Sequence, residues 1–411
     1  MKLTCVPDWF ILTMIIIFVY SCKKEPVVST KITLVPVGLL DSIRTVSGTL
    51  IPTASLTLKV GQTDTIRATV TPSNDSDKIS WNTSNSAIAG VDQSGLVTGI
   101  ATGTTLITAT IGNGNITATC RVTVSRWLTY NQSGADFGAI AIDAQGNKWF
   151  GSDIGVFEFD GTNWTTYNTS NSGLAEDYVR TLAIDAQGNK WFGTDNAGIS
   201  KFDGTNWTTY DTGNSGLTSN HIEAMVIDGN GNKWFGTGAG VSEFDGSNWT
   251  SFLAKNSISA ISIDAKGNIW FGGNGIWKFD GNQMTLIYNT ASGPNGIAGY
   301  SVWTIAIDSQ GSQWFGTESG VYEFDGTRWT TYNHLESGLA GNWVGAIAID
   351  AQHNVWFATL DGVSKFDGTN WTVYSAQGGS YIFGVGMVCM NIDAQGNKWF
   401  GSFGVVELYN Q

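Results

Sequence analysis

The dipeptide Trp-Phe recurs at nearly even spacing through the last two thirds of the chain, and this repeat limits the possible folds more than any other feature. From residue 149 onward its copies begin at Trp149, Trp191, Trp234, Trp270, Trp314, Trp356 and Trp399, at intervals of 36 to 44 residues. A period of about 40 residues marks a repeat architecture, in which each unit is one small motif that buries its core against its neighbours. Residues 127–411 are therefore expected to form an array of seven similar units.

Each unit has the pattern of four short strands joined by tight turns. In the first unit an apolar strand ends at Asp143, and a Gly-Asn turn leads to a second strand, Lys148–Ser152. A third strand, Gly155–Asp160, and a fourth, Trp164–Tyr167, follow. Four strands in about 42 residues are typical of a propeller blade. The 52 glycines and 18 tryptophans among 411 residues also favour many short strands and turns over helices.

The two ends of the array predict how the ring closes. Trp127–Tyr130 matches the fourth strand of a unit but has no first three strands before it. Val405–Tyr409 matches a third strand and has no fourth strand after it. Pairing these segments would complete a seventh blade and leave no open sheet edge between the ends. The predicted fold class is all-β, with a seven-bladed β-propeller at 127–411 closed by one N-terminal and three C-terminal strands.

Residues 30–125 predict an immunoglobulin-like β-sandwich before the propeller. Leu56–Val60 and Thr65–Val70 alternate apolar and polar residues with a period of two, and turn-forming residues separate them. Several short strands at such spacing are typical of a sandwich. Cys120 in this segment and Cys389 in the propeller are expected to be buried free thiols, with an interdomain disulfide as the alternative.

Both parts resemble known families. Ile79–Asn85, Gly95–Gly99 and Cys120–Val124 are similar to bacterial immunoglobulin-like domains of group 2, which implies a stalk or adhesion module. The repeats, with Ser-Gly-Leu loops beginning at Ser172, Ser215 and Ser337, resemble the two-component regulator propeller family. That resemblance implies an extracytoplasmic sensor module of a kind that often responds to glycans. No transmembrane helix, kinase or response regulator is expected after the propeller, so the resemblance implies the binding module alone.

The first 29 residues predict export and anchoring. Residues 1–21 combine a basic start, a short apolar run and a small residue, Ser21, which is typical of a signal peptide. Val19–Cys22 resembles a lipobox, although Tyr20 departs from the usual small residue, so Cys22 is the expected lipidation site and 22–29 the anchor linker. Acylation there would hold the protein on a membrane, and the expected location is the cell surface as an outer-membrane lipoprotein. The alternative is a plain secretion signal with a free Cys22.

Positions that differ among the units are the candidates for ligand binding. In a propeller the first strand of each blade lines the channel, and the loop leading into it shares a face with the loop between strands two and three. The candidate residues are Asp136, Asp153, Tyr178, Arg180, Asp195, Asn196, His221, Glu223, Tyr300, Trp303, Glu318, Trp343, Asp361 and Tyr381. Aromatic rings stack on the apolar faces of sugars and carboxylates accept hydroxyl hydrogen bonds, so this set suits a carbohydrate. Ordinary variation of surface loops is the alternative.

Composition and motifs exclude several other functions. The formal net charge of −13 disfavours nucleic acid as a partner. The sequence has no zinc-ligand spacing, no Gly-x-Ser-x-Gly motif and no phosphate-binding loop, so no cofactor, metal or catalytic residue is expected. The function that we expect is a monomeric cell-surface lipoprotein whose propeller binds an extracellular ligand, a polysaccharide. The alternatives are a structural or protein-binding surface module and a lyase or glycoside hydrolase that uses paired carboxylates.

Overall fold

The structure, a computed structural model, describes residues 31–36, 54–71, 78–111, 116–125, 127–130, 134–253, 255–289, 301–374 and 389–409. Every regular element in these ranges is a β-strand, so the all-β prediction is confirmed. The chain divides into two compact units, Met1–Arg126 and Trp127–Gln411. Cys22, Tyr300 and Tyr381 lie outside the described residues. The described part contains no helix with the length and apolar character that a membrane crossing needs.

The first unit is a sandwich of two four-stranded sheets. One sheet has the order β1-β3-β6-β5 and the other β2-β8-β7-β4, with β2 and β8 parallel. The strands are β1 (Lys31–Pro36), β2 (Ala54–Lys59), β3 (Thr63–Thr71), β4 (Ile79–Thr83), β5 (Ala89–Val91), β6 (Leu96–Gly99), β7 (Gly103–Ile111) and β8 (Ile116–Ser125). Leu58, Ile66, Ile107 and Val122 are buried between the sheets, because alternate residues of each strand face inward. Cys120 is a buried free thiol, and burial raises its pKa to about 11.

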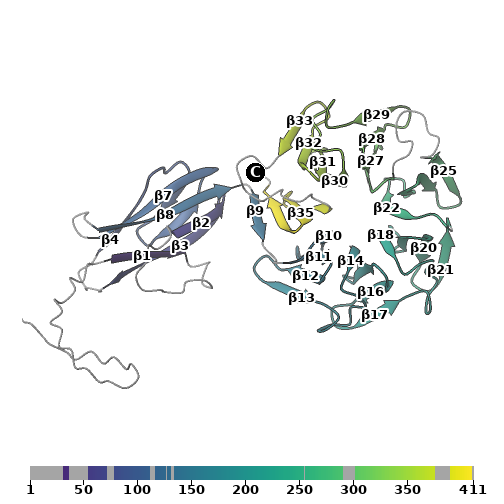
Figure 1. The fold of residues 1–411 in the computed structure, drawn as a ribbon, viewed down its shortest axis with the longest axis horizontal. Helices are drawn as coiled ribbons and strands as arrows, with labels where there is room; N and C mark the ends of the chain where they lie inside the picture. The colour runs from purple at the N-terminus through teal and green to yellow at the C-terminus, as the bar shows by residue number, and fades with distance from the viewer. Residues whose placement is uncertain are drawn as a thin grey trace, which may run out of the picture. The chain divides into compact units, whose positions relative to one another are not determined.

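The second unit is a ring of blades. Within the described residues it contains seven four-stranded antiparallel sheets set radially around an axis, with the first strand of each sheet innermost (Figure 1). The innermost strands of successive sheets lie against one another, and that of the seventh sheet lies against that of the first. We number these sheets as blades 1 to 7 in chain order.

Every blade uses strands of four to six residues. Blades 1 to 3 are β10 (Phe137–Ile142), β11 (Lys148–Ser152), β12 (Gly155–Phe159), β13 (Trp164–Tyr167); β14 (Val179–Ile184), β15 (Lys190–Thr194), β16 (Ile199–Phe202), β17 (Trp207–Tyr210); and β18 (Ile222–Ile227), β19 (Lys233–Thr237), β20 (Gly240–Phe244), β21 (Trp249–Phe252). Blades 4 and 5 are β22 (Ile258–Ile263), β23 (Ile269–Gly273), β24 (Gly275–Phe279), β25 (Met284–Asn289); and β26 (Thr304–Ile307), β27 (Gln313–Thr317), β28 (Gly320–Phe324), β29 (Trp329–Tyr332). Blades 6 and 7 are β30 (Val344–Ile349), β31 (Val355–Thr359), β32 (Gly362–Phe366), β33 (Trp371–Tyr374); and β34 (Cys389–Ile392), β35 (Lys398–Ser402), β36 (Gly404–Leu408), β9 (Trp127–Tyr130).

The N-terminal strand of the propeller completes blade 7. β9 pairs antiparallel with β36, with Tyr130 opposite Val405 and Trp127 opposite Leu408. Tyr130 Oη donates to Glu407 Oε2 at 2.9 Å across this junction. The same bond joins Tyr167 to Glu158 inside blade 1, at 3.0 Å. The closing junction is therefore chemically equivalent to a pair of neighbouring strands within one blade.

An Asp–Trp hydrogen bond is repeated in every blade. In all seven blades the indole Nε1 of the repeated Trp donates to the carboxylate of the Asp that ends the first strand, at 2.8 to 3.4 Å. In blade 1 the other oxygen of Asp143 accepts the backbone N–H groups of Gln145 and Asn147. The carboxylate is thus fully used by the turn and the indole, which is a structural role. Within the described residues no group of His, Cys, Asp and Glu side chains has the arrangement of a metal site.

The turn between the first two strands needs one residue with positive φ. Glycine adopts it without strain in six blades, at Gly146, Gly188, Gly231, Gly267, Gly311 and Gly396. Blade 6 places His353 there instead, with φ of 64°. His353 is therefore held at a turn and not among the candidate ligand-binding residues.

Lysines join neighbouring blades at four of the seven junctions. Lys190, which begins the second strand of blade 2, places Nζ 4.8 Å from the ring centroid of Trp149 in blade 1 and 3.9 Å from Asp143 Oδ2. The equivalent pairs are Lys148 with Trp399, Lys233 with Trp191, and Lys398 with Trp356. Burial lowers the pKa of Lys398, and the nearby Asp350 carboxylate partly offsets this. Each contact is a cation–π interaction between blades, which we call a lysine clamp.

Blades 4, 5 and 6 begin their second strands with Ile269, Gln313 and Val355 and so lack the clamp. Gln313 is 7% exposed, and its Oε1 is the buried side-chain atom of the described residues that has no hydrogen-bond partner. An orphaned buried acceptor costs about 1–3 kcal/mol. The junction between blades 4 and 5 is therefore less well satisfied than the clamped ones.

Replacing Gln313 with Lys should stabilise the propeller. The new ammonium group would lie over Trp270 of blade 4, and the orphaned oxygen would be gone. A gain of about 1 kcal/mol is expected from the cation–π contact, seen as a raised unfolding midpoint in thermal denaturation. The reverse change, Lys190→Gln, should lower the midpoint. Gln313→Met is the matched control, because it removes the oxygen without adding charge; a Met variant as stable as the Lys variant would contradict the clamp.

The Asp–Trp bond also makes stability depend on pH. Burial raises the pKa of Asp185, but the hydrogen bonds from Asn189 and Trp191 outweigh it, and the net pKa is lowered. A carboxylate with a lowered folded-state pKa stabilises the fold fully above the unfolded pKa of about 3.9, and that stabilisation declines below this value and is lost as the pH falls through the lower folded-state pKa.

Asp185→Asn should therefore destabilise the protein by about 1.5–3 kcal/mol at neutral pH, since bonds to a charged acceptor are lost. Near pH 3 the gap between variant and wild type should narrow, because the carboxyl group of unfolded wild-type protein is then mostly protonated, which favours the unfolded state. Thermal unfolding of both proteins across this pH range measures it. An equal gap at both pH values would show that the charge of Asp185 contributes nothing.

Candidate functional site

The alternation of strand direction brings two sets of loops to one face of the ring. In blades 1, 2, 3 and 6 the loop leading into the blade meets the loop between its second and third strands through a backbone hydrogen bond. Asp195 N donates to Tyr178 O at 3.1 Å in blade 2, and Gly238 N donates to His221 O at 3.0 Å in blade 3. We call this the rim face. The turns between the first and second strands begin at the Asp that is bonded to the repeated Trp. They lie on the opposite face of the ring, because each strand crosses from one face to the other, and we call this the turn face.

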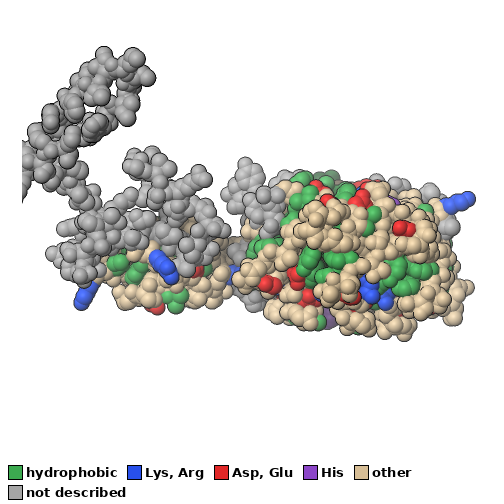
Figure 2. Space-filling view, turned by 90° about the horizontal axis from the view of Figure 1, so that it is seen from below, with side chains coloured by type: hydrophobic (Ala, Val, Ile, Leu, Met, Phe, Trp, Pro, Cys, Tyr) green, Lys and Arg blue, Asp and Glu red, His purple; other side chains and the backbone are tan. Residues whose placement is uncertain are grey.

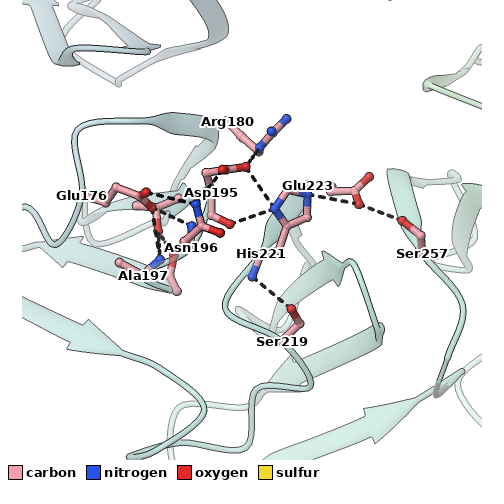
Figure 3. Close-up of polar contacts among 11 residues, drawn as sticks. Glu176, Arg180, Asp195, Asn196, Ala197, Ser219, His221, Glu223 and Ser257 are labelled. Atoms are coloured by element: carbon pink, nitrogen blue, oxygen red, sulfur yellow. Dashed lines mark hydrogen bonds and ion pairs between the residues drawn. The ribbon is translucent and has the colours of Figure 1, made fainter.

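Asp195 is the centre of a polar cluster on blades 2 and 3 (Figure 3). Its carboxylate accepts a hydrogen bond from Arg180 Nε and another from Asn196 Nδ2, the latter at 2.7 Å. His221 of the next blade places Nδ1 3.0 Å from Asp195 Oδ1 and 2.8 Å from the Asp195 carbonyl oxygen. Both oxygens are acceptors, so Nδ1 is the ring nitrogen that carries a proton. These contacts link blade 2 to blade 3 at the rim.

The cluster extends to blade 4 on one side and into the loop before blade 2 on the other. Glu223 Oε1 lies 3.4 Å from His221 Nε2 and accepts a hydrogen bond from Ser257 Oγ of blade 4 at 2.7 Å. Glu176 accepts the backbone N–H groups of Asn196 and Ala197, at 2.6 and 3.1 Å. We define the polar cluster by its side chains Glu176, Arg180, Asp195, Asn196, His221, Glu223 and Ser257.

The polar cluster is partly exposed, and the carboxylate at its centre, Asp195, stays ionised. Burial raises the pKa of Asp195, but hydrogen bonding and charge from Arg180, then Asn196 and His221, outweigh it and lower the pKa overall. The guanidinium of Arg180 also lies over the Tyr178 ring, 4.8 Å from its centroid. Asp195 is therefore an ionised acceptor and a poor proton donor. The side chains of Arg180 and His221 are about a third exposed, at 35% and 33%, so a ligand can reach them.

Two tryptophans form a second group on blades 5 and 6. The ring centroids of Trp303 and Trp343 lie 6.3 Å apart with an interplanar angle of 33°. Trp303 Nε1 donates to Glu318 Oε2 at 3.1 Å, which fixes the orientation of the indole. Trp303 is nevertheless 41% exposed. We call Trp303 and Trp343 the aromatic pair.

Among the described candidates, Asp136, Asp153 and Asp361 make none of the side-chain contacts that define these two groups. Asp153 Oδ1 accepts the backbone N–H of Asp136 at 2.8 Å in blade 1, and burial together with the Asp153 charge raises the pKa of Asp136. Asp361 lies in blade 6 against Gly341, where an added Cβ would meet Asp361 Oδ2 at 2.4 Å. Tyr300 and Tyr381 stay predictions, because they lie outside the described residues.

Sequence patterns missed several rim-face residues. Glu176 comes from the loop before blade 2 and lies 20 residues from Asn196 in the sequence, so only the fold brings the two together. Exposed apolar side chains occupy the loop between strands two and three in blades 1, 6 and 7; these are Ile154, Leu360 and Phe403. Phe403 is 62% exposed. The sequence did hold a signal for this exposure: Phe403 is the single residue between β35 and β36, and so short a turn leaves its side chain little room to point inward.

Comparison with known families supports the division into two units. Residues 46–122 match the family described as bacterial Ig-like domain (group 2), and residues 253–275 match the family described as two component regulator propeller. The class of protein is thus an immunoglobulin-like domain joined to a β-propeller. One segment of the chain thus matches the group 2 bacterial immunoglobulin-like domain and another matches the two-component regulator propeller family, so both resemblances are confirmed.

The curated relatives match only short stretches. An uncharacterised protein of Clostridium acetobutylicum is 44% identical over 71 residues, which is 17% of this chain and 7% of that protein. A 3-O-alpha-D-galactosyl-alpha-L-arabinofuranosidase of Bifidobacterium longum subsp. longum is 36% identical over 104 residues, 24% of this chain and 9% of that protein. This chain therefore spans less than a tenth of the length of either relative.

Solved structures share the fold at low identity. The extracellular domain of a protein assigned to the hybrid two-component systems of B. thetaiotaomicron has a TM-score of 0.60 at 22% identity, covering 74% of this chain and 44% of that one. A catalytically inactive virginiamycin B lyase of Staphylococcus aureus has a TM-score of 0.56 at 16% identity, covering 69% and 98%. PorZ, a surface component of the type-IX secretion system of Porphyromonas gingivalis, has 0.57 at 13%, covering 86% and 56%. At these identities the likeness shows the fold alone.

Proposed function

We propose that this chain is an extracellular binding protein whose propeller holds a polysaccharide on its rim face. The observation that carries the proposal is the placement of the polar cluster and the aromatic pair on one face of the ring. Both groups are made of residues that differ from blade to blade, whereas the residues of the turn face are nearly the same in every blade. A surface that varies while its scaffold repeats is where a propeller can acquire specificity.

The chemistry of the rim face suits sugars. A sugar presents hydroxyl donors and acceptors around its edge and C–H groups on its faces. Asn196 offers an amide and Glu223 a carboxylate whose Oε2 has no hydrogen bond among the described residues, so both can bind hydroxyls. The exposed Trp303 ring, fixed by Glu318, offers a rigid stacking surface at low entropic cost.

We further propose that the protein is displayed at the cell surface by a lipid on Cys22, with the immunoglobulin-like domain as a stalk and a monomeric propeller. The signal-like segment 1–21 and the cysteine that follows it support the anchor. Two solved structures with this fold support the location, because one is an extracellular domain and the other is a bacterial surface component.

Trp303→Ala should weaken glycan binding at least tenfold without altering the unfolding midpoint, because the ring is exposed and stacking is lost. Affinity electrophoresis of the purified protein through gels that contain plant and microbial polysaccharides measures it. Arg328→Gln, in an exposed turn on the turn face, is the control and should bind as wild type. If none of the polysaccharides slows the migration of the wild-type protein, the proposed function is refuted and a protein-binding or structural module is favoured.

Cys22→Ser should release the protein from the membrane. Expressed with its leader in a Gram-negative host, the wild type is expected to incorporate radiolabelled palmitate and to sediment with the outer membrane. The Ser variant should incorporate none and appear in the soluble fraction. Cys120→Ser, which changes a buried thiol of the described fold, is the matched control. Unchanged labelling of the Cys22 variant would overturn the anchor.

A further inference from the structure

We infer that the ligand of the rim face is an uncharged oligosaccharide that lies across blades 2 to 6 and contacts the polar cluster and the aromatic pair at once. This inference rests on the proposed function and narrows it to a class of glycan and a direction of binding. Two independent observations carry it: the sign of the charge on the rim face, and the contacts that run from blade to blade along it.

The rim face carries an excess of carboxylates. Seven of the described rim-face side chains are acidic: Asp136, Asp153, Glu176, Asp195, Glu223, Glu318 and Asp361. The described cluster holds one guanidinium, Arg180, and it is already engaged by the Asp195 carboxylate and the Tyr178 ring. The side of the propeller in Figure 2 likewise shows acidic (red) and apolar (green) side chains with few basic ones (blue). Lys255, which is exposed in the loop leading into blade 4, also lies on this face. One ammonium group does not balance seven carboxylates, so a polyuronate or sulfated glycan would meet net repulsion.

Three of these carboxylates already have internal partners with which a cationic ligand would have to compete. Asp195 is neutralised by Arg180, Glu318 accepts the indole N–H of Trp303, and Asp153 accepts the backbone of Asp136. What these groups still offer is lone pairs, which accept hydrogen bonds from hydroxyls. Neutral hydroxyl-rich ligands satisfy them without having to displace an internal partner.

Contacts between blades make the two groups one continuous surface. Ser257 of blade 4 donates to Glu223 of blade 3, and Ser259 Oγ donates to Val302 O at 2.8 Å, next to Trp303 of blade 5. Trp303 in turn faces Trp343 of blade 6. Polar and aromatic side chains thus follow one another from blade 2 to blade 6. Because two blades separate Tyr178 from Trp303, a single sugar unit cannot contact both, and a chain of several units is required.

Charge selectivity is tested by calorimetric titration of the full chain with neutral arabinan, galactomannan and β-glucan, with acidic polygalacturonate and chondroitin sulfate, and with oligolysine. A neutral glycan should bind with an affinity that changes less than about twofold between about 50 mM and 500 mM salt, because no counterions are released. The acidic polymers should not bind. Tighter binding of an acidic polymer would overturn the inference and leave the proposed function standing. Salt-sensitive binding of oligolysine alone would overturn both.

The direction of binding is tested with a length series of the neutral glycan that binds. Tyr178→Ala and Trp303→Ala should each weaken the longer oligosaccharides about tenfold. The shortest fragments should be weakened by only one of the two changes, since they reach only one group. Lys266→Gln on the turn face is the control and should have no effect. If either variant binds long oligosaccharides as well as wild type does, the ligand does not span the two groups.

Discussion

The hydrogen bond between the repeated indole and the aspartate before it is the interaction on which the propeller depends. A buried Trp must find a partner for its N–H, and the carboxylate that ends the first strand supplies it in each blade. The same carboxylate closes the turn between the first two strands, so one side chain fixes both their register and their connection. Once that register is set at the turn face, the residues at the other end of the strands are placed on the rim face.

This division of labour explains why the variable residues can vary. Blade packing depends on the Trp, Phe and Asp of the repeat and on the lysine clamps. These residues lie in the middle of each blade or toward its turn face. The loops leading into blades 2, 3 and 6 add one buried leucine each to that core, at Leu174, Leu217 and Leu339. Their polar side chains contact the neighbouring blade, as His221 does with Asp195 and Ser257 with Glu223. A substitution there changes local contacts between two blades without disturbing the sheets beneath.

The sequence alone was sufficient for the repeat, the strand pattern and the position of the rim, because each follows from counting along the chain from a fixed Asp. It could not provide the contacts between blades. The approach of Glu176 to Asn196, or of His221 to Asp195, depends on the twist of two sheets and on loop length, which no local pattern encodes. The exposure of Phe403 was also missed, although the single-residue turn that holds it is a local feature of the sequence. The lysine clamps were hidden because Lys148 and its equivalents look like ordinary solvent-exposed strand starts.

The turn face is a weaker candidate for a binding surface, for a reason that strengthens the case for the rim. Its carboxylates are numerous, but each already accepts hydrogen bonds within its own blade. Asp143 accepts them from Trp149 and two backbone N–H groups, and Asp160 accepts them from the backbone N–H groups of Thr162 and Asn163. Hydrogen bonds from the turn lower the pKa of Asp160, so it remains an ionised acceptor held by its own backbone. A ligand would have to break the turns to use them. Because the same turns recur around the ring, the turn face would also present one pattern many times. The rim face presents a different pattern at each blade. It can therefore distinguish one end of an asymmetric ligand from the other.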